Sequence, residues 1–332
     1  MPNGQNRPSS PFVSMTPASR VDRKGAPIGL VLVLFTALIS GVSVFVNSFA
    51  VQGTNSDAFI TIRNLLVAGM LVPLAFLVRP ADRAPLRRKD CIRLAAIGLV
   101  GGAIPFVLFF RGLSMAEAAG ATASFVYRTL FLMAAVLGIV VLREKVSPRL
   151  ALGGVALLAG NALLLSLTSP IWTDGTALVL AATLLWAVEY TMSKRALRDL
   201  PSATVALGRM GFGAVFLFAY LAASGQLGAV AGFSGAHVQW ILISAVFLLA
   251  FVSTWYAGLK HVDLSTATAV LVLAFPVTWA LKVLAAKEAL GLVEAAGAAV
   301  VVFGVCLAVG LAAMRETAAR VVRVLLREGP RA

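Results

Sequence analysis

Apolar stretches of about 20 residues, separated by short polar segments, fill the chain from residue 28 to residue 313. A helix of that length crosses the hydrocarbon core of a bilayer, and the period-two alternation of a β-barrel is absent. The pattern predicts an all-α integral membrane protein with ten transmembrane helices. Their predicted ranges are 28–50, 57–78, 92–112, 119–142, 149–168, 174–193, 202–222, 237–258, 264–286 and 291–313.

Composition supports this class. Hydrophobic residues make up 60% of the chain and charged residues only 13%, whereas a soluble domain carries about 25% charged residues. The two cysteines are too few for a disulfide framework, and the two histidines have no partners at metal-ligand spacing. Phosphate-binding and nucleophile motifs are also absent. We therefore expect no metal, no cofactor, no ATP-driven pump and no enzyme.

The net charge of +14 is explained by topology, which makes a nucleic-acid partner unnecessary. With the N-terminus inside, 22 of the 28 lysines and arginines fall on inner segments, only Arg111 and Lys287 fall on outer loops, and four lie within helices. This positive-inside asymmetry predicts that both termini are cytoplasmic, in a bacterial inner membrane. Residues 1–27 read as a disordered cytoplasmic N-terminus. For the basic tail, 314–332, the sequence is compatible with two alternatives: a helix that lies on the anionic lipid surface, or a solvated segment.

The chain contains an internal repeat. The segment GLSMAEAAGATA from Gly112 returns 146 residues later as GLKHVDLSTATA from Gly258, and Arg143-Glu144 returns 144 residues later as Lys287-Glu288. The copies span 28–168 and 174–313, with five predicted helices each. An odd number of crossings inverts the second copy relative to the first, an arrangement typical of transporters that work by alternating access. The alternative is a duplicated scaffold that transports nothing.

These motifs resemble the drug/metabolite transporter superfamily in its ten-helix form with two EamA-type repeats. The resemblance rests on the repeated segments above, on TALVLAATLLWAVEYTMSKRAL from Thr176, and on an arginine early in the second helix of each copy, Arg63 and Arg209. It implies a carrier of small metabolites or drugs, most often an exporter. The family usually has a proline in the fourth helix of each copy. Here the second copy has Pro276, but the first has Leu130 to Leu132, so the two halves need not bind alike.

Candidate substrate-binding residues are the polar and aromatic side chains deep in the helices, because buried ionisable groups are costly and are usually functional. Arg128 is the deepest, about 13 Å from one helix end and about 21 Å from the other. Ser124 lies one turn before Arg128, and Tyr127 lies beside it. The sequence predicts that Arg128 lines a central cavity and binds a carboxylate, phosphate or carbonyl group.

Glu189 is the one carboxylate well inside a predicted helix, on a broad face shared with Trp186 and Tyr190. Two interpretations remain open. It forms a structural pair with Arg209, or it acts as a proton carrier or as the ligand of an amino group. For Arg63 a structural role is favoured, with Asp57, Asn47 or the interface as its partner.

The ninth helix supplies the remaining candidates. Pro276 should bend it, and Phe275, Trp279 and Lys282 share one face nearby, although Lys282 is close enough to the helix end to reach water. Other residues are predicted to have structural roles. Trp255 and Tyr256 look like interfacial aromatics, Glu144 is expected to pair locally with Arg143, and the glycines of the fifth and tenth helices should permit close packing. These glycines are Gly153, Gly154, Gly160, Gly297 and Gly304.

The sequence therefore predicts a secondary transporter, most simply an exporter, of a small polar metabolite. Four cations and one carboxylate inside the helices favour a solute with an anionic group, such as an amino acid or organic acid. Proton coupling is a further possibility, and no pattern specifies an oligomeric state. The alternative is a lipid-carrier flippase or an accessory subunit of envelope synthesis, with a phosphate clamp built from Arg63, Arg128 and Arg209.

Overall fold

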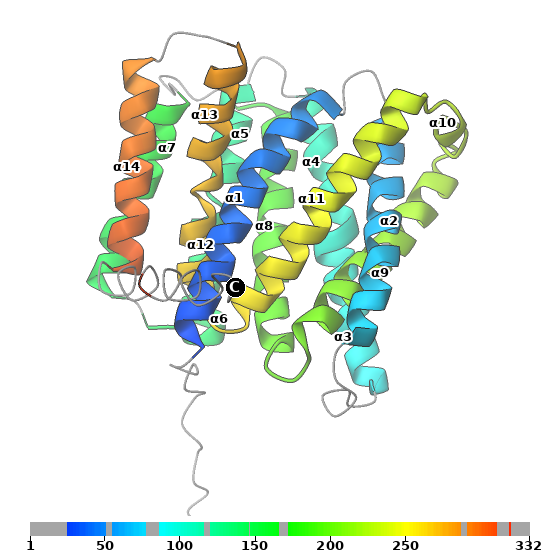
Figure 1. Cartoon of the computed structure of the whole chain (residues 1–332), viewed down its shortest axis with the longest axis horizontal. Helices are drawn as coiled ribbons and strands as arrows, with labels where there is room; N and C mark the ends of the chain where they lie inside the picture. The colour runs from blue at the N-terminus through cyan, green and yellow to red at the C-terminus, as the bar shows by residue number, and fades with distance from the viewer. Residues whose placement is uncertain are drawn as a thin grey trace, which may run out of the picture.

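The computed structural model describes residues 25–50, 55–77, 86–115, 120–145, 147–165, 172–286, 291–310 and 319. Long helices stand side by side in one bundle (Figure 1), as the hydrophobic pattern predicts. Within these ranges, nine helical spans are long and apolar enough to cross a membrane, and a tenth, Pro148–Leu164, has 17 residues. A helix of 17 residues is still at the lower limit for crossing a bilayer. The expected ten crossings therefore correspond to ten helical spans.

The first copy contains eight helical segments. They are α1 (Ala26–Ala50), α2 (Ser56–Leu77), α3 (Arg88–Ile97), the π-helix η2 (Gly98–Ala103), α4 (Ile104–Met115), α5 (Gly120–Arg128), α6 (Leu130–Leu142) and α7 (Pro148–Leu164). The segments α3, η2 and α4 follow one another without a gap and form a single crossing, Arg88–Met115. That crossing begins four residues before the predicted 92–112.

The second copy contains seven segments. They are α8 (Asp174–Ala196), α9 (Ser202–Ala223), the short α10 (Gly228–Ala231), α11 (Gly235–Leu259), α12 (Leu264–Leu271), α13 (Ala274–Ala286) and α14 (Leu292–Val309). The four-residue α10 was not expected from the sequence. Residues 1–24 of the predicted disordered segment lie outside the described residues, and so does the basic tail apart from residue 319. The prediction is wrong at residues 26 and 27, which are helical and begin α1.

The arrangement is that of an inverted repeat. In Figure 1, α1 begins and α14 ends on the same, lower face of the bundle. Packing pairs recur under the repeat: α1 packs on α11 as α8 packs on α4, and α1 packs on α12 as α8 packs on α5. The helices α5, α6 and α7 begin 144 residues before α12, α13 and α14. The two extra residues of the first copy therefore lie between Gly112 and Leu130, where α6 begins.

Both copies have a broken fourth helix. The second copy breaks between α12 and α13, where the amides of Val272 and Leu273 bond three residues back instead of four, just before Pro276. Proline has no amide hydrogen and its ring crowds the carbonyl four residues earlier, which here is Val272. The first copy breaks at the equivalent Thr129 without a proline. The Thr129 hydroxyl donates to the Val126 carbonyl at 2.6 Å and tightens that turn. The predicted crossing 119–142 is present as one apolar span, Thr122–Leu142, and its break at Thr129 was not expected from the sequence.

The helices α7 and α14 pack closely through glycines. A Cβ atom on Gly153 would lie 2.7 Å from the Gly304 carbonyl oxygen, and one on Gly160 would lie 2.7 Å from the Val301 amide nitrogen. Gly297 and Gly304 meet α7 backbone in the same way. Gly154 differs, because its Cβ would approach only a Phe131 ring atom, at 3.9 Å. The predicted close packing therefore holds for four of the five glycines and is wrong for Gly154.

Adjacent glycines on α7 provide a matched test of this packing. We expect Gly153→Ala to destabilise the protein by about 1–3 kcal/mol, because the added methyl group overpacks a backbone contact. Gly154→Ala should be neutral or stabilising by up to about 1 kcal/mol, since alanine favours helix and the site has room. Thermal unfolding in detergent would measure both variants. Equal melting temperatures for Gly153→Ala and the wild type would contradict the glycine interface.

Candidate functional site

A cavity of about 40 Å³ lies where the two broken helices meet. Its wall takes residues from both copies, on α1, α5 and α6 of the first and on α8, α11, α12 and α13 of the second. The lining residues are Ser40, Val44, Tyr127, Arg128, Leu130, Phe131, Tyr190, Phe251, Thr268, Leu271, Val272, Ala274 and Phe275. Non-helical backbone is tolerated at membrane depth only inside protein or beside a cavity. The two breaks therefore position this site.

Arg128, the last residue of α5, carries the only charge among the described lining residues. Its guanidinium carbon lies 4.3 Å from the centroid of the Phe275 ring, a cation–π contact between the two copies. Its Nη1 donates to Asn161 Oδ1 at 3.3 Å, and the Asn161 amide in turn donates to the Leu157 carbonyl at 2.8 Å. These contacts orient Arg128, and among the described residues no carboxylate pairs with its positive charge.

Aromatic side chains from both copies connect Arg128 to Arg63. The Tyr127 ring lies 6.2 Å from Phe275 and 5.5 Å from Trp186, measured between centroids. Trp186 packs edge-on against Phe106 at 5.5 Å, and the guanidinium of Arg63 lies 5.7 Å from the Phe106 ring. Two buried guanidinium groups, those of Arg128 and Arg63, are therefore separated by a continuous run of aromatic rings.

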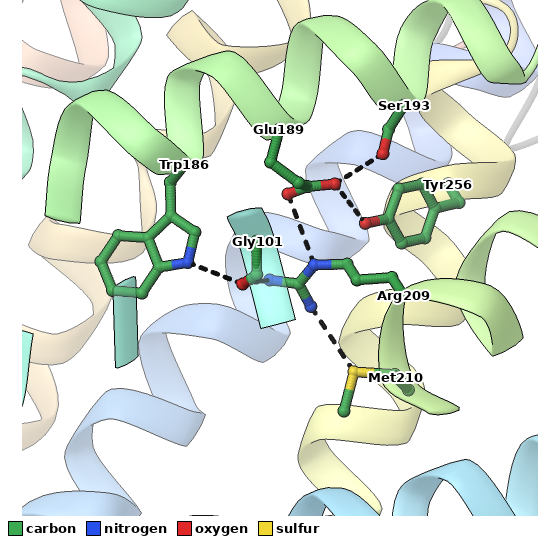
Figure 2. A network of polar contacts seen from close by, with 7 residues as sticks. All are labelled: Gly101, Trp186, Glu189, Ser193, Arg209, Met210 and Tyr256. Atoms are coloured by element: carbon green, nitrogen blue, oxygen red, sulfur yellow. Dashed lines mark hydrogen bonds and ion pairs between the residues drawn. The ribbon is translucent and has the colours of Figure 1, made fainter. Parts of the chain in front are cut away.

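A second polar group surrounds Glu189, whose side chain is fully buried (Figure 2). Arg209 Nε lies 3.4 Å from Glu189 Oε2. Glu189 Oε1 accepts hydrogen bonds from the Ser193 hydroxyl at 2.5 Å and from the Tyr256 hydroxyl at 2.8 Å. Because the carboxylate faces a guanidinium and two hydroxyls, its charge is compensated within the protein.

The π-helix η2 supports this network. Its residue Gly101 presents a carbonyl that accepts from Trp186 Nε1 and from Arg209 Nη2, each at 3.1 Å (Figure 2). A Cβ atom on Gly101 would collide with the Glu189 side chain. The glycine-rich sequence GLVGGA therefore lets the third crossing approach α8 closely and turn a carbonyl towards Arg209.

A third polar cluster closes the lower face of the bundle. Glu144, just after α6, accepts hydrogen bonds from the amides of Leu264 and Ser265 at 2.6 and 3.0 Å, and so caps the N-terminus of α12. Lys194 of α8 donates to the carbonyls of Leu259 and Val262, both at 2.6 Å. The local Glu144–Arg143 pair expected from the sequence is wrong, because the carboxylate binds the opposite copy instead.

The match to a family model decides what kind of protein this is. Residues 27–166 and 173–310 each match the model of the EamA-like transporter family. The chain belongs to the EamA-like transporter family. It is therefore a membrane transporter of the drug/metabolite superfamily type, with two EamA repeats, as the resemblance of its motifs implied.

Structural comparison supports the same fold. A solved crystal structure of another protein aligns with this transporter at a TM-score of 0.70 and 19% sequence identity. The alignment covers 85% of the transporter and 97% of the other chain. At that identity the likeness shows the fold alone. No curated protein matches the transporter.

The structure brings four of the predicted binding residues of the transporter into one cavity: Tyr127, Arg128, Tyr190 and Phe275. Trp186 contacts this group through Tyr127. Four other candidates, Ser124, Glu189, Pro276 and Trp279, are not among the lining residues. Pro276 acts on the site indirectly, since the break that precedes it places Val272 and Phe275 on the cavity wall.

The supporting charges have different environments in the transporter. Arg209 pairs with Glu189, as one sequence interpretation proposed, and Lys282 is exposed near the end of α13. Arg63 is 6% exposed and donates to Asn64 Oδ1 at 3.2 and 3.3 Å. The partners expected for Arg63 are engaged elsewhere, because Asp57 accepts from Tyr220 and Asn47 accepts from Ser244.

The sequence analysis did not predict several residues that line the cavity or contact the polar groups around it. Ser40, Asn161 and Thr268 lie at or beside the cavity, and Asn161 was detectable as a buried amide inside an apolar, glycine-rich helix. Trp255 and Tyr256 were read as interfacial aromatics, which is wrong, since each is 1% exposed. Tyr256 binds Glu189, while Trp255 packs on Tyr190 with the ring centroids 4.7 Å apart. In the described ranges no cluster of three or more histidine, cysteine or acidic residues forms a metal site.

Proposed function

We propose that this EamA-like transporter is a secondary transporter of a small metabolite with an anionic group, an amino acid or an organic acid. The observation that carries the proposal is Arg128, a guanidinium on the wall of a cavity built by both repeats that has no carboxylate partner in the described part of the chain. A charge in a membrane interior is costly and is usually kept for a ligand, a pair or a water path. An anionic group that enters the cavity would provide the missing partner.

The charge balance of the buried groups supports an anion. Among the described residues inside the bundle, Arg209 has a carboxylate partner in Glu189, whereas Arg63 and Arg128 contact amide oxygens and aromatic rings. Each of these two arginines is only partly compensated by such neutral groups. The interior therefore has an excess of positive charge, which lowers the cost of bringing in a negatively charged solute.

Transport by alternating access is supported by one difference between the repeats. The helix α6 packs closely on α12, but the symmetry-related pair, α13 and α5, lacks comparable packing within the described residues. The other pairs noted above recur in both copies. In a transporter at one end of its cycle, the helices are expected to pack closely at one face and to be separated at the symmetry-related face.

We assign the closed face to the cytoplasm of a bacterium, with both termini on that side. Basic residues cluster around it, including Arg88, Lys89, Arg143, Lys145 and Arg149. This distribution follows the positive-inside rule. With this orientation the less closely packed pair, α13 and α5, lies towards the outside. Export is the direction implied by the family resemblance, and coupling to protons through Glu189 is the simplest energy source if the solute moves uphill.

Reconstitution tests the proposal. Purified protein should be screened by thermal shift against amino acids, organic acids and cationic drugs, since a ligand that binds the folded state raises its melting temperature. Solutes that bind should then show counterflow in proteoliposomes at a rate above that of empty vesicles. Binding and counterflow restricted to cationic solutes would contradict an anionic substrate.

The alternative of a lipid-carrier flippase needs a phosphate clamp made from three arginines. Arg209 is paired with Glu189 and with the Gly101 carbonyl, so the described geometry does not assemble that clamp. Polyprenyl phosphate that co-purifies at one molecule per protein would reverse this preference. The transporter hypothesis instead requires that such a lipid be absent from active preparations.

The cytoplasmic closure has its own test. In Glu144→Ala the amides of Leu264 and Ser265 lose their acceptor, so the α6–α12 contact should weaken by about 1 kcal/mol, the usual value of a helix cap. Hydrogen exchange at the start of α12 should accelerate about fivefold. Unchanged exchange in this variant would rule out Glu144 as the closing contact.

Asp263→Asn is the matched control for this test. Asp263 precedes α12, but its side chain makes no capping hydrogen bond. Burial and the neighbouring Glu144 raise the pKa of the Asp263 carboxyl group, with Lys194 opposing the shift. The charged form is thus disfavoured, and a neutral amide at this position should leave the exchange rate of α12 unchanged.

A further inference from the structure

The described lining of the cavity offers a cation but no anion, and this charge pattern bears on the two classes of solute just proposed. Arg128 supplies the only charge among the described lining residues, and the rest of the wall is apolar, aromatic or hydroxylic. An amino acid carries an ammonium group beside its carboxylate. That ammonium group would enter the cavity close to the Arg128 guanidinium, where like charges repel.

Glu189 directly precedes the lining residue Tyr190 in the sequence, but its carboxylate is not available to the ammonium group of a solute. It is 0% exposed and does not line the cavity. Its oxygens face Arg209, Ser193 and Tyr256. Redirecting this carboxylate towards a solute would leave Arg209 buried without its counter-charge, which costs several kcal/mol.

The aromatic wall provides only limited compensation for a second cation. Aromatic faces attract ammonium groups by about 0.5–2 kcal/mol, less than a buried charge pair contributes. The Phe275 ring already has the Arg128 guanidinium over it, at 4.3 Å. The remaining rings of the wall, among them Phe131 and Phe251, are better suited to an aliphatic or aromatic body.

Hydroxyl groups on the wall suit a neutral oxygen next to the carboxylate. Tyr127 and Tyr190 come from opposite copies and both line the cavity with Arg128. A phenol donates a hydrogen bond to a carbonyl oxygen. A carboxylate with an adjacent keto group therefore matches the donors present, namely a guanidinium and two phenols.

We infer that the preferred substrates are carboxylates with an apolar body and no ammonium group, such as branched-chain 2-oxo acids, over the amino acids of the same shape. This inference rests on the proposed function and narrows it from amino or organic acids to organic acids. In this inference Arg128 holds the carboxylate of the solute, and the absence of a carboxylate from the described cavity lining is the cause of the selectivity.

A matched pair of solutes tests the inference. The probes are 4-methyl-2-oxopentanoate and leucine, which have the same carbon skeleton and differ in a keto group against an ammonium group. Thermal shift and proteoliposome counterflow should be measured on the full chain. We expect the half-maximal response to the oxo acid at a concentration at least about tenfold lower than for leucine, because the ammonium group of leucine lacks a partner.

Two variants complete the test. Arg128→Gln should need an oxo acid concentration about tenfold higher or more for the same response, since the charge that holds the carboxylate is removed. Arg88→Gln, which removes an exposed charge at the start of α3, should respond like the wild type.

Each outcome distinguishes the inference from the function on which it rests. A response to leucine equal to or stronger than that to the oxo acid overturns the inference and leaves an anion-binding transporter in place. No response to the oxo acid, with counterflow of another anionic solute from the wider panel, also overturns it while the proposed function stands. If none of the anionic solutes moves, both fail.

Discussion

Replacing Arg128 by alanine is expected to reduce transport to the rate of empty proteoliposomes while leaving the protein folded. The guanidinium is the single charge on the described cavity wall, and a lost partner for a buried charge costs about 2–5 kcal/mol. That range corresponds to a loss of about 30-fold or more in apparent affinity. Its structural contacts are one 3.3 Å hydrogen bond and one ring face, so the fold should tolerate the change.

Arg128→Lys refines this prediction. Lysine keeps the charge but cannot hold a carboxylate through two parallel N–H groups. We expect a raised half-saturation concentration with a smaller change in the maximal rate, measured by counterflow in proteoliposomes. Size-exclusion profiles and melting temperatures should match the wild type for both variants. Normal counterflow by Arg128→Ala across the solute panel would remove Arg128 from the site.

Removing Arg209 is expected to cause the largest loss of stability. Arg209→Met leaves the Glu189 carboxylate fully buried with only the hydroxyls of Ser193 and Tyr256 as partners. An uncompensated charge of this kind costs about 3–5 kcal/mol. The variant should unfold at a clearly lower temperature in detergent, or fail to accumulate in the membrane.

The double variant Glu189→Gln/Arg209→Met is the control. With both charges removed, the site contains neutral groups of similar size, and such replacements of a buried pair are often close to neutral. We therefore expect the double variant to regain most of the stability lost by Arg209→Met. If the single and double variants unfold alike, the Glu189–Arg209 pair does not act as a compensated pair. Transport by a stable double variant would also show that Glu189 is not an essential proton carrier.

The crossings were predictable because the bilayer requires apolar stretches of fixed length, and the inverted repeat followed from helix counting. The break at Thr129 was not predictable, since no proline marks it and one threonine hydroxyl, bonded to Val126, shapes that turn. The bend near Pro276 was expected for a local covalent reason, the missing amide hydrogen. Local chemistry with a known cause can thus be read from the sequence, whereas context-dependent turns cannot.

Contacts between residues far apart in the sequence were the other feature that could not be predicted. The carboxylate of Glu144 binds residues 120 and 121 positions away, and nothing near Glu144 in the sequence indicates that α12 begins beside it. Arg128 was found because a charge in an apolar helix stands out against its neighbours. Phe251 and Ser40 were missed because a phenylalanine or serine in a transmembrane helix has many possible surroundings. The position of each on the wall is determined by the packing of the other copy.

The helix break at Thr129 also has a consequence for how the protein is made. The first repeat leaves the ribosome first, and its break interrupts a helix at membrane depth, where irregular backbone is tolerated only inside protein or beside a cavity. The groups that cover this break, among them Phe251, Val272 and Phe275, belong to the second repeat. The half-made chain therefore has an incompletely buried centre until α11, α12 and α13 have been inserted.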